Sequence, residues 1–320
     1  MDLANILMIL QLVEKYLYQI VSPIVIFMGL VGSIFNVIVF KQKSLRKSPC
    51  TIYFITYNVL NFIYMFASFL SLSLDAGFQI DPSVSNMSCC RLRIYITIVL
   101  NILSPFCLIL ASIDRILVTS SNALTRQKST FRLAYMSLFG GILFWCLFHT
   151  HAIIMAYIFE IAPNVFLCFY SSGSYLVFIG YYFIIKEIIV LILLIILGFL
   201  PIRNIHRIHR VRPNTQAILS RSGGIGNTSR SSTSRERQMV VMLLFDIIIY
   251  ASCSFFFAIF LLYQQVTQNY TKTYEHLQID FYILNFCLFS MGIPLCMSFY
   301  TNLLTSTTFR KEIKKSLYCR

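Results

Sequence analysis

Long apolar stretches alternate with short polar segments along the whole chain. A helix needs about 20 apolar residues to cross the hydrocarbon core of a bilayer, and seven stretches meet this requirement. They are continuously apolar, whereas the strands of a membrane barrel would alternate apolar and polar residues. The pattern therefore predicts an all-α integral membrane protein, a seven-transmembrane helix bundle. The predicted spans cover residues 18–40, 51–74, 94–119, 135–158, 175–200, 239–263 and 281–304.

The composition supports a membrane protein and excludes a soluble domain. Hydrophobic residues make up 58% of the 320 residues, and charged residues only 12%. A soluble domain carries roughly 25% charged residues, and a chain this apolar could not cover a surface that faces water. We therefore expect most of the surface to face lipid.

The basic residues are divided unevenly between the two sides of the predicted bundle. Of the 26 Lys and Arg, 21 lie in or beside the segments that follow spans one, three, five and seven. Basic residues mark the cytoplasmic side, so we expect a multi-pass plasma-membrane protein with its N-terminus extracellular and its C-terminus cytoplasmic. Topology and attraction to anionic lipid then explain the net charge of +14. Membrane lipid is the expected partner, and nucleic acid is not.

The organisation predicted from these patterns has one membrane domain and short flanking segments. Residues 1–17 form a short extracellular N-terminus without the basic region of a signal peptide. The seven-transmembrane domain covers 18–304 and contains a basic third cytoplasmic loop at 202–237, rich in Ser, Gly and Arg, which we expect to be mobile. Residues 305–320 form a cytoplasmic tail with a short amphipathic helix.

An acid and a base stand side by side where the third apolar stretch ends, in "SIDRI". Asp114 and Arg115 would lie where the predicted third span meets the cytosol. A simple interface anchor would have no particular spacing to other features of the chain.

Five features at compatible spacing resemble the rhodopsin-like (class A) family of G-protein-coupled receptors, over nearly the whole chain. The first is an Asn on a helix face after a Gly, here Gly32 and Asn36 in "GSIFNVIVF". The others are a Cys 25 residues before Arg115, a Cys in the second outer loop, a lone Trp in span four, and an amphipathic helix that begins Phe-Arg at residue 309. The chain resembles the divergent peptide- or orphan-type receptors that some invertebrates carry.

The chain also departs from the family pattern. Span two of the family has an Asp that helps to bind sodium, and the best-matching residue here is the neutral Asn61. Phe256 occupies the position of the Pro in span six, and "SFYTN" at 298–302 replaces the Asn-Pro-x-x-Tyr of span seven. These departures put the sodium site and the usual activation switches in question.

The resemblance implies specific roles for several residues. Cys90 and Cys168 would form a disulfide that ties the second outer loop to span three. Asp114 would restrain Arg115 in the inactive state, and Arg115 would turn towards a heterotrimeric G protein when span six moves away from span three. Asp246, in the inner half of span six, is a candidate switch residue or a buried hydrogen-bonded side chain. The structural polar residues of the bundle would be Asn36, Asn61 and Trp145.

The candidate ligand pocket lies in the outer half of the bundle. Amine receptors of the family carry an Asp 18 residues before the motif Arg, where this chain has Thr97, and opsins carry a Lys in span seven, where residues 281–304 have none. A peptide, such as a neuropeptide, is therefore the favoured ligand. Thr97, Asn101, Lys186 and Glu187 are the candidate pocket residues. Since adjacent helix residues point about 100° apart, we expect Lys186 and Glu187 not to pair with each other.

The remaining candidates are modification sites and a different functional class. Asn86 and Asn269 begin glycosylation sequons in predicted outer loops, and Cys319 in the basic tail is a candidate for palmitoylation. No enzyme motif, cofactor or metal site is expected. A seven-helix ligand-gated channel, transporter or chemoreceptor that uses no G protein is the alternative, although transporters often show internal repeats and none is evident here.

Overall fold

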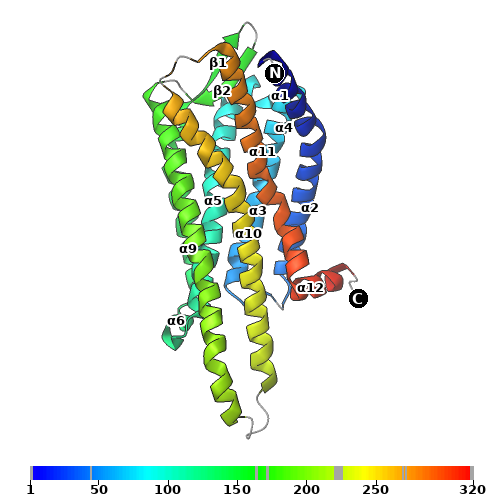
Figure 1. The fold of residues 1–320 in the computed structure, drawn as a ribbon, viewed down its shortest axis with the longest axis vertical. Coiled ribbons are helices and arrows are strands. Elements are labelled where there is room, and N and C mark those ends of the chain that lie inside the picture. Colours follow the sequence, from blue (N-terminus) through cyan, green and yellow to red (C-terminus); the bar gives the residue numbers. More distant parts are fainter. Residues whose placement is uncertain are drawn as a thin grey trace.

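A computed structural model describes residues 3–43, 45–162, 165–170, 173–219, 226–268, 270 and 272–317. Within these residues, seven helices are long and apolar enough to cross a membrane (Figure 1). The protein is therefore a multi-pass membrane protein with an all-α bundle of seven spans, as the sequence predicts. In order, the spanning segments are Asn5–Phe40, Cys50–Phe78, Met87–Thr119, Phe131–Met155, Ser174–Ile205, Glu236–Thr267 and Tyr274–Thr305.

Three of the spans are built from more than one helical element. The first combines α1 (Leu3–Tyr16), a π-helical turn (Leu17–Val21) and α2 (Ser22–Phe40), and the second combines α3 (Cys50–Tyr64), a π-helical turn (Met65–Phe69) and α4 (Leu70–Phe78). The fourth consists of α7 (Phe131–Phe148) and α8 (His151–Met155). The other elements are a 3-10 turn (Pro82–Ser85), α5 (Met87–Thr119), α6 (Ala123–Gln127), α9 (Ser174–Leu219), α10 (Gly226–Thr267), α11 (Tyr274–Thr305) and α12 (Thr307–Leu317).

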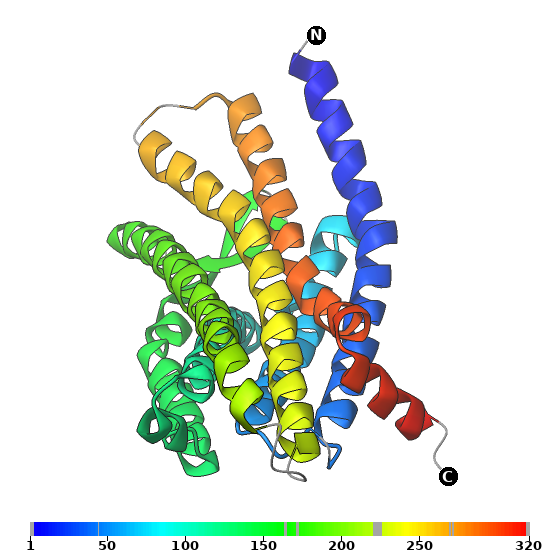
Figure 2. The same cartoon turned by 60° about the horizontal axis from the view of Figure 1, so that its bottom comes forward.

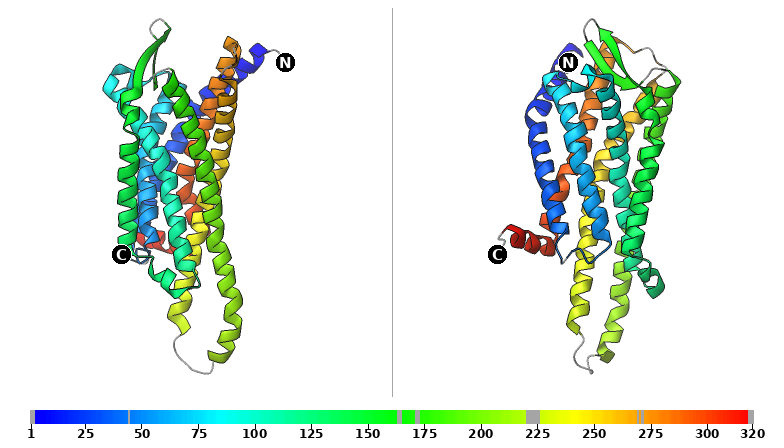
Figure 3. Two further views of the ribbon diagram at one scale, coloured as in Figure 1. Left: turned by 90° about the vertical axis from the view of Figure 1, so that its left-hand side faces the viewer. Right: turned by 180° about the vertical axis from the view of Figure 1, so that it is seen from behind.

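The connection between the fourth and fifth spans contains an antiparallel β-hairpin. Its strands are β1 (Ala156–Ala162) and β2 (Val165–Tyr170), with Ala156 paired to Tyr170. Figure 3 shows the hairpin and α12 at opposite ends of the molecule. We call these the hairpin end and the α12 end.

Several boundaries differ from those predicted. The predicted N-terminal segment 1–17 is helical from Leu3, and it continues the first span towards the hairpin end. The fourth span ends at Met155 rather than 158, because the chain turns into β1 there. The predicted loop 202–237 is helical as far as Leu219 and again from Gly226, and α9 and α10 project beyond the α12 end (Figure 1). The mobility of this loop stays a prediction.

The third span is the central element of the bundle. α5 is the most deeply buried of the seven spans and the fourth span is the least buried. Side chains that point outwards are large and apolar, with Phe139 72% exposed and Phe199 67% exposed. Lipid chains cover such a surface without the penalty that water would impose. The interior, by contrast, contains many of the polar side chains, and these define the candidate sites.

The short helix α12 turns away from the axis of α11 at the α12 end (Figure 2). Its apolar residue Phe309 is fully buried, with its ring 5.6 Å from that of Phe40, while Lys311 and Lys314 are exposed. An apolar face and a basic face are typical of a helix that lies in a membrane interface. The amphipathic helix predicted after the seventh span is therefore present, and Phe309 anchors it to α2.

Candidate functional site

Arg115 lies fully buried near the α12 end of α5. Its Nη2 donates to Oδ2 of Asp114 at 2.6 Å and to Oγ of Ser48 at 2.8 Å. Its Nη1 forms an ion pair with the carboxylate of Glu236, at the start of the sixth span. We call these four residues the arginine clamp. The clamp ties the third span to the sixth.

Asp114 is held by a further contact from the chain between α6 and α7. The Oγ of Ser129 donates to Oδ1 of Asp114 at 2.5 Å. The clamp places two carboxylates around one guanidinium. The Glu236 side chain is 21% exposed, so water partly solvates its carboxylate. Removing one partner of a buried ion pair typically costs about 3–5 kcal/mol. The clamp is therefore a strong local constraint that opens most easily on the side of Glu236.

The sequence motif located Asp114 and Arg115 but not the other members of the clamp. Glu236 lies 121 residues further along the chain than Arg115, within the segment predicted as a mobile loop. The available signal was one acidic residue just before the apolar run of the sixth span, in "RERQMVV". Ser48 and Ser129 are common polar residues in inter-helix segments and gave no signal.

A second group of polar side chains crosses the bundle from α2 to α10. The Nδ2 of Asn36 donates to Oδ1 of Asn58 at 2.6 Å and lies 3.5 Å from Oγ of Ser298. Ser298 in turn donates to Oδ2 of Asp246 at 3.3 Å. All four side chains are buried. The structure thus brings the predicted residues Asn36 and Asp246 into one chain of hydrogen bonds, through two residues that were not predicted.

The other two predicted polar residues, Asn61 and Trp145, do not take part in these hydrogen bonds. The Oδ1 of Asn61 accepts a hydrogen bond of 2.8 Å from Ser104 on α5. Trp145 on α7 is partly buried, and its ring packs against Phe148 and His149 with centroids 5.9 Å and 5.7 Å away. Asn61 connects the second and third spans, while Trp145 belongs to an aromatic cluster on the fourth.

The predicted ligand-pocket residues lie on α5 and α9. Thr97 shares a hydrogen bond of 2.8 Å with Ser68. Lys186 and Glu187 are both buried, and the ammonium group donates to Oδ1 of Asn101 and to Oε1 of Glu187. The expectation that these two neighbours on α9 would not pair is therefore wrong. The long Lys side chain bends back over the 100° that separates the two positions on the helix.

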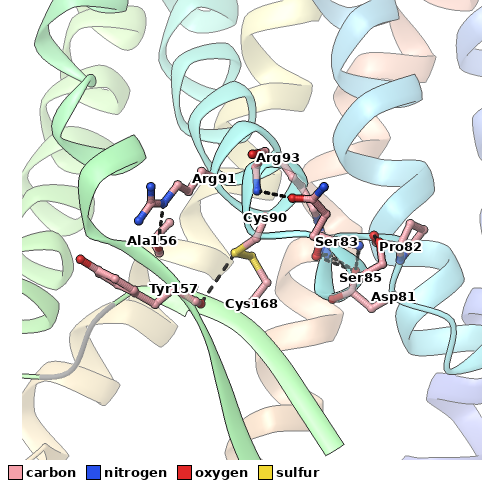
Figure 4. The surroundings of a disulfide bond; sticks show 12 residues. Asp81, Pro82, Ser83, Ser85, Cys90, Arg91, Arg93, Ala156, Tyr157 and Cys168 are labelled. Atoms are coloured by element: carbon pink, nitrogen blue, oxygen red, sulfur yellow. Dashed lines mark hydrogen bonds and ion pairs between the residues drawn. A yellow bond between two sulfur atoms is a disulfide. The ribbon is translucent and has the colours of Figure 1, made fainter.

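A disulfide joins Cys90 in the first turn of α5 to Cys168 in β2, the pair that the resemblance implies. Figure 4 shows it between α5 and the hairpin. Arg91 adds a hydrogen bond of 3.3 Å from Nε to the backbone oxygen of Ala156, and its guanidinium lies over the ring of Tyr157. The hairpin is therefore fixed across the end of the third span.

Arg93, one turn further along α5, fixes the connection after the second span. Its Nη1 forms an ion pair of 2.7 Å with Asp81 and donates to Oγ of Ser83 at 2.8 Å (Figure 4). Asp81 also accepts from the backbone nitrogen of Ser83 at 2.9 Å. One disulfide and several polar contacts therefore hold the connections at the hairpin end in place.

The predicted modification sites are only partly described. Asn86 is exposed and begins α5, with its Oδ1 accepting from the backbone nitrogen of Ser88 at 2.8 Å. Its glycosylation stays a prediction. Asn269 and Cys319 lie outside the described residues. Within the described part of the chain, no three His, Cys, Asp or Glu side chains gather into a group that could hold a metal ion.

No model of a known protein family matches this chain, and no characterised protein matches it in a sequence search. The arrangement of the described residues therefore provides the basis for a functional proposal.

Proposed function

We propose that the protein is a divergent rhodopsin-like receptor, which binds an extracellular ligand and activates a heterotrimeric G protein. The observation that carries the proposal is the arginine clamp. Arg115 is held by Asp114 on its own helix and by Glu236 at the start of α10. An ion pair that joins two spans at one end of a bundle is a two-state element. It is closed when Arg115 binds Glu236, and it is open when the helices separate and both side chains are exposed to water.

We infer that the hairpin end faces the outside of the cell and the α12 end faces the cytosol. The uneven distribution of Lys and Arg supports this orientation, since the α12 end has Lys41, Arg126 and α12 with its Lys residues. The disulfide at the hairpin end is consistent with it, because disulfides persist in oxidising compartments. In this orientation the protein is a plasma-membrane receptor with an extracellular N-terminus.

Signalling would proceed through movement of α10 relative to α5. A ligand bound near Thr97, Asn101 and α9 would favour a state in which the start of α10 lies further from α5. Arg115 would then lose Glu236 as a partner and become available to the G protein. Coupling free energies between two sites are typically 1–3 kcal/mol. Such a coupling is sufficient to open the clamp, because water hydrates Glu236 as it leaves Arg115 and so lowers the cost of opening.

The proposal is tested by ligand-independent G-protein activation in cells that express the wild type, Arg115→Ala or Arg132→Ala. Arg132 is exposed at the same end of the bundle, so its variant controls for loss of one basic residue. We expect activation above that of untransfected cells for the wild type and Arg132→Ala, and none for Arg115→Ala. Activation that survives in Arg115→Ala would contradict the mechanism. Membrane current without any G-protein response would favour a channel.

A further inference from the structure

An ion pair lies in the interior of the bundle, on the side of α9 that faces α5. Lys186 is 7% exposed and Glu187 is fully buried. The Lys186 ammonium has two acceptors, Oδ1 of Asn101 and Oε1 of Glu187. Buried charges are costly in a membrane span and usually mark a functional site. The positive member of this pair is well satisfied by its two acceptors.

The negative member of the pair is not satisfied. The second carboxylate oxygen of Glu187, Oε2, is buried and has no hydrogen-bond partner among the described residues. An unpaired buried acceptor costs about 1–3 kcal/mol, and more when it is charged. The missing partner is therefore a hydrogen-bond donor, and a charged donor would offset the cost best. An anionic ligand would instead meet a carboxylate and an already occupied ammonium.

Three tyrosine side chains experience the charge of the unsatisfied carboxylate. The hydroxyls of Tyr64, Tyr182 and Tyr250 lie within electrostatic range of Glu187, and they come from three different spans. The hydroxyl of Tyr250 is also buried without a partner among the described residues. A buried carboxylate with tyrosines in its electrostatic range suits an organic cation, because the carboxylate pairs with the positive charge and aromatic ring faces attract cations.

Two polar residues of α5 that lie between the hairpin end and this cluster are partly exposed. Thr97 and Asn101 lie one helix turn apart on α5, and both remain partly exposed although they bond to neighbouring spans. Tyr64 is also only partly buried. Thr97 offers only a hydroxyl, which is engaged with Ser68, so the anionic group of the cluster comes from α9 rather than from α5.

We propose that this cluster binds a small organic cation, whose ammonium or guanidinium group donates to Oε2 of Glu187. The inference rests on the proposed function only in treating the interior of the bundle as the ligand site, and it defines the ligand class as cationic. Asn101 positions the Lys186 ammonium, which in turn binds Oε1 of Glu187, and the tyrosine rings contact the apolar part of the ligand.

The test is thermal unfolding of the purified full chain in detergent, with phenethylammonium as the probe. Phenethyl alcohol and phenylacetate serve as neutral and anionic counterparts of similar size. We expect millimolar phenethylammonium to raise the unfolding midpoint of the wild type, because a ligand that binds only the folded state stabilises it. The alcohol and the acid should give no comparable rise. A rise of equal size with the alcohol, or no rise with the ammonium, overturns the proposal.

Variants of the pair assign the effect to Glu187. Glu187→Gln should weaken the apparent affinity for phenethylammonium by roughly tenfold or more, the effect of losing a charged hydrogen bond. Glu275→Gln, an exposed carboxylate at the hairpin end, should bind as the wild type does. An unchanged affinity in Glu187→Gln overturns the proposal.

Lys186→Gln provides a measurement that does not depend on the folding of Glu187→Gln. Without its internal cation, Glu187 should bind phenethylammonium more tightly than in the wild type. A structural ion pair with no ligand role predicts no tightening, and that result overturns the proposal.

Two further comparisons distinguish a peptide ligand from another organic cation, and the cation site from the proposed G-protein signalling. Phenylalanyl-glycinamide presents the same ammonium at a peptide amino terminus, so a rise with it that is absent for its N-acetylated form supports the cation site and favours a peptide ligand. Equal rises with both forms overturn the claim. Because no G protein is present, binding that depends on Glu187 without any G-protein activation in cells would keep this inference and remove the proposed function.

Discussion

At the residue scale, the most informative side chains are polar and lie inside the bundle. Asp114 and Arg115 were found from a local motif, since two adjacent charges at the end of an apolar run are visible in the sequence. Their partners Ser48 and Glu236 lie 67 and 121 residues from Arg115. Contacts over such separations depend on how helices pack, so they could not be predicted from local patterns.

The polar chain through α2 predicts a measurable contribution to stability. In Asn36→Ala, Asn58 loses its 2.6 Å donor inside the bundle. Leaving a buried polar group unpaired costs about 1–3 kcal/mol, so the midpoint of thermal unfolding in detergent should fall. Asn5→Ala, on the exposed side of the same span, should leave the midpoint nearly unchanged. Equal effects of the two substitutions would show that these buried hydrogen bonds do not stabilise the fold.

The flexibility of a long side chain explains why Lys186 and Glu187 pair although we expected that they would not. Helix geometry gives the direction in which each side chain leaves the backbone, but not where a long flexible chain ends. Burial removes water as a competing partner, so the ammonium bonds to the nearest acceptors, Oε1 of Glu187 and Oδ1 of Asn101. The sequence singled out both members of this ion pair without identifying their contact, and their role in a ligand pocket stays a prediction.

At the element scale, the spans were predictable because an apolar stretch of sufficient length has few alternatives in a membrane. The ends of the spans were less predictable. The fourth predicted span ran on to 158 because Tyr157 and Ile158 are apolar, yet both belong to β1. A short apolar run cannot be assigned to helix or strand by its pattern alone. Here the pairing with β2, anchored by the disulfide, decides in favour of the strand.

The contact between α2 and α11 depends on a residue without a side chain. A Cβ added at Gly32 would lie 2.9 Å from Cβ of Phe299, which cannot rotate away because the backbone fixes its position. Gly32→Ala should therefore separate the two helices and lower stability by about 1–3 kcal/mol, the usual cost of overpacking. Unfolding of the purified chain in detergent measures this effect.

Gly140 provides the matched control for this substitution. A Cβ added there meets no atom within 4 Å, and Ala is a better helix former than Gly by about 1 kcal/mol. Gly140→Ala should be neutral or slightly stabilising. Two variants of equal stability would contradict the close approach of α2 and α11.

The hairpin should depend on its covalent link to α5. Cys168→Ser removes the bond to Cys90, and loss of a disulfide typically costs about 2–4 kcal/mol. We expect faster proteolysis within β1 and β2 and a lower unfolding midpoint. Cys89→Ser removes the neighbouring free cysteine and should change neither. Equal protease resistance in the two variants would show that polar contacts alone hold the hairpin.

At the scale of the whole molecule, the two ends of the bundle have different constructions. The hairpin end is fixed by a disulfide and by Arg91 and Arg93. The α12 end is held by the arginine clamp and by Gln238, whose Oε1 accepts from Ser306 and from the backbone of Thr308. A covalent link cannot switch, whereas ion pairs and hydrogen bonds can. A conformational change is therefore expected at the α12 end.

The measurement that tests the clamp most directly is ligand-independent G-protein activation by Glu236→Gln. The substitution keeps the size of the side chain but removes the charge that binds Arg115 to α10. Glu236→Gln should show higher basal activation than the wild type at equal surface expression, by several-fold if the ion pair contributes about 1 kcal/mol or more to the closed state. Basal activation equal to or below that of the wild type would show that the ion pair between Arg115 and Glu236 does not hold the receptor inactive.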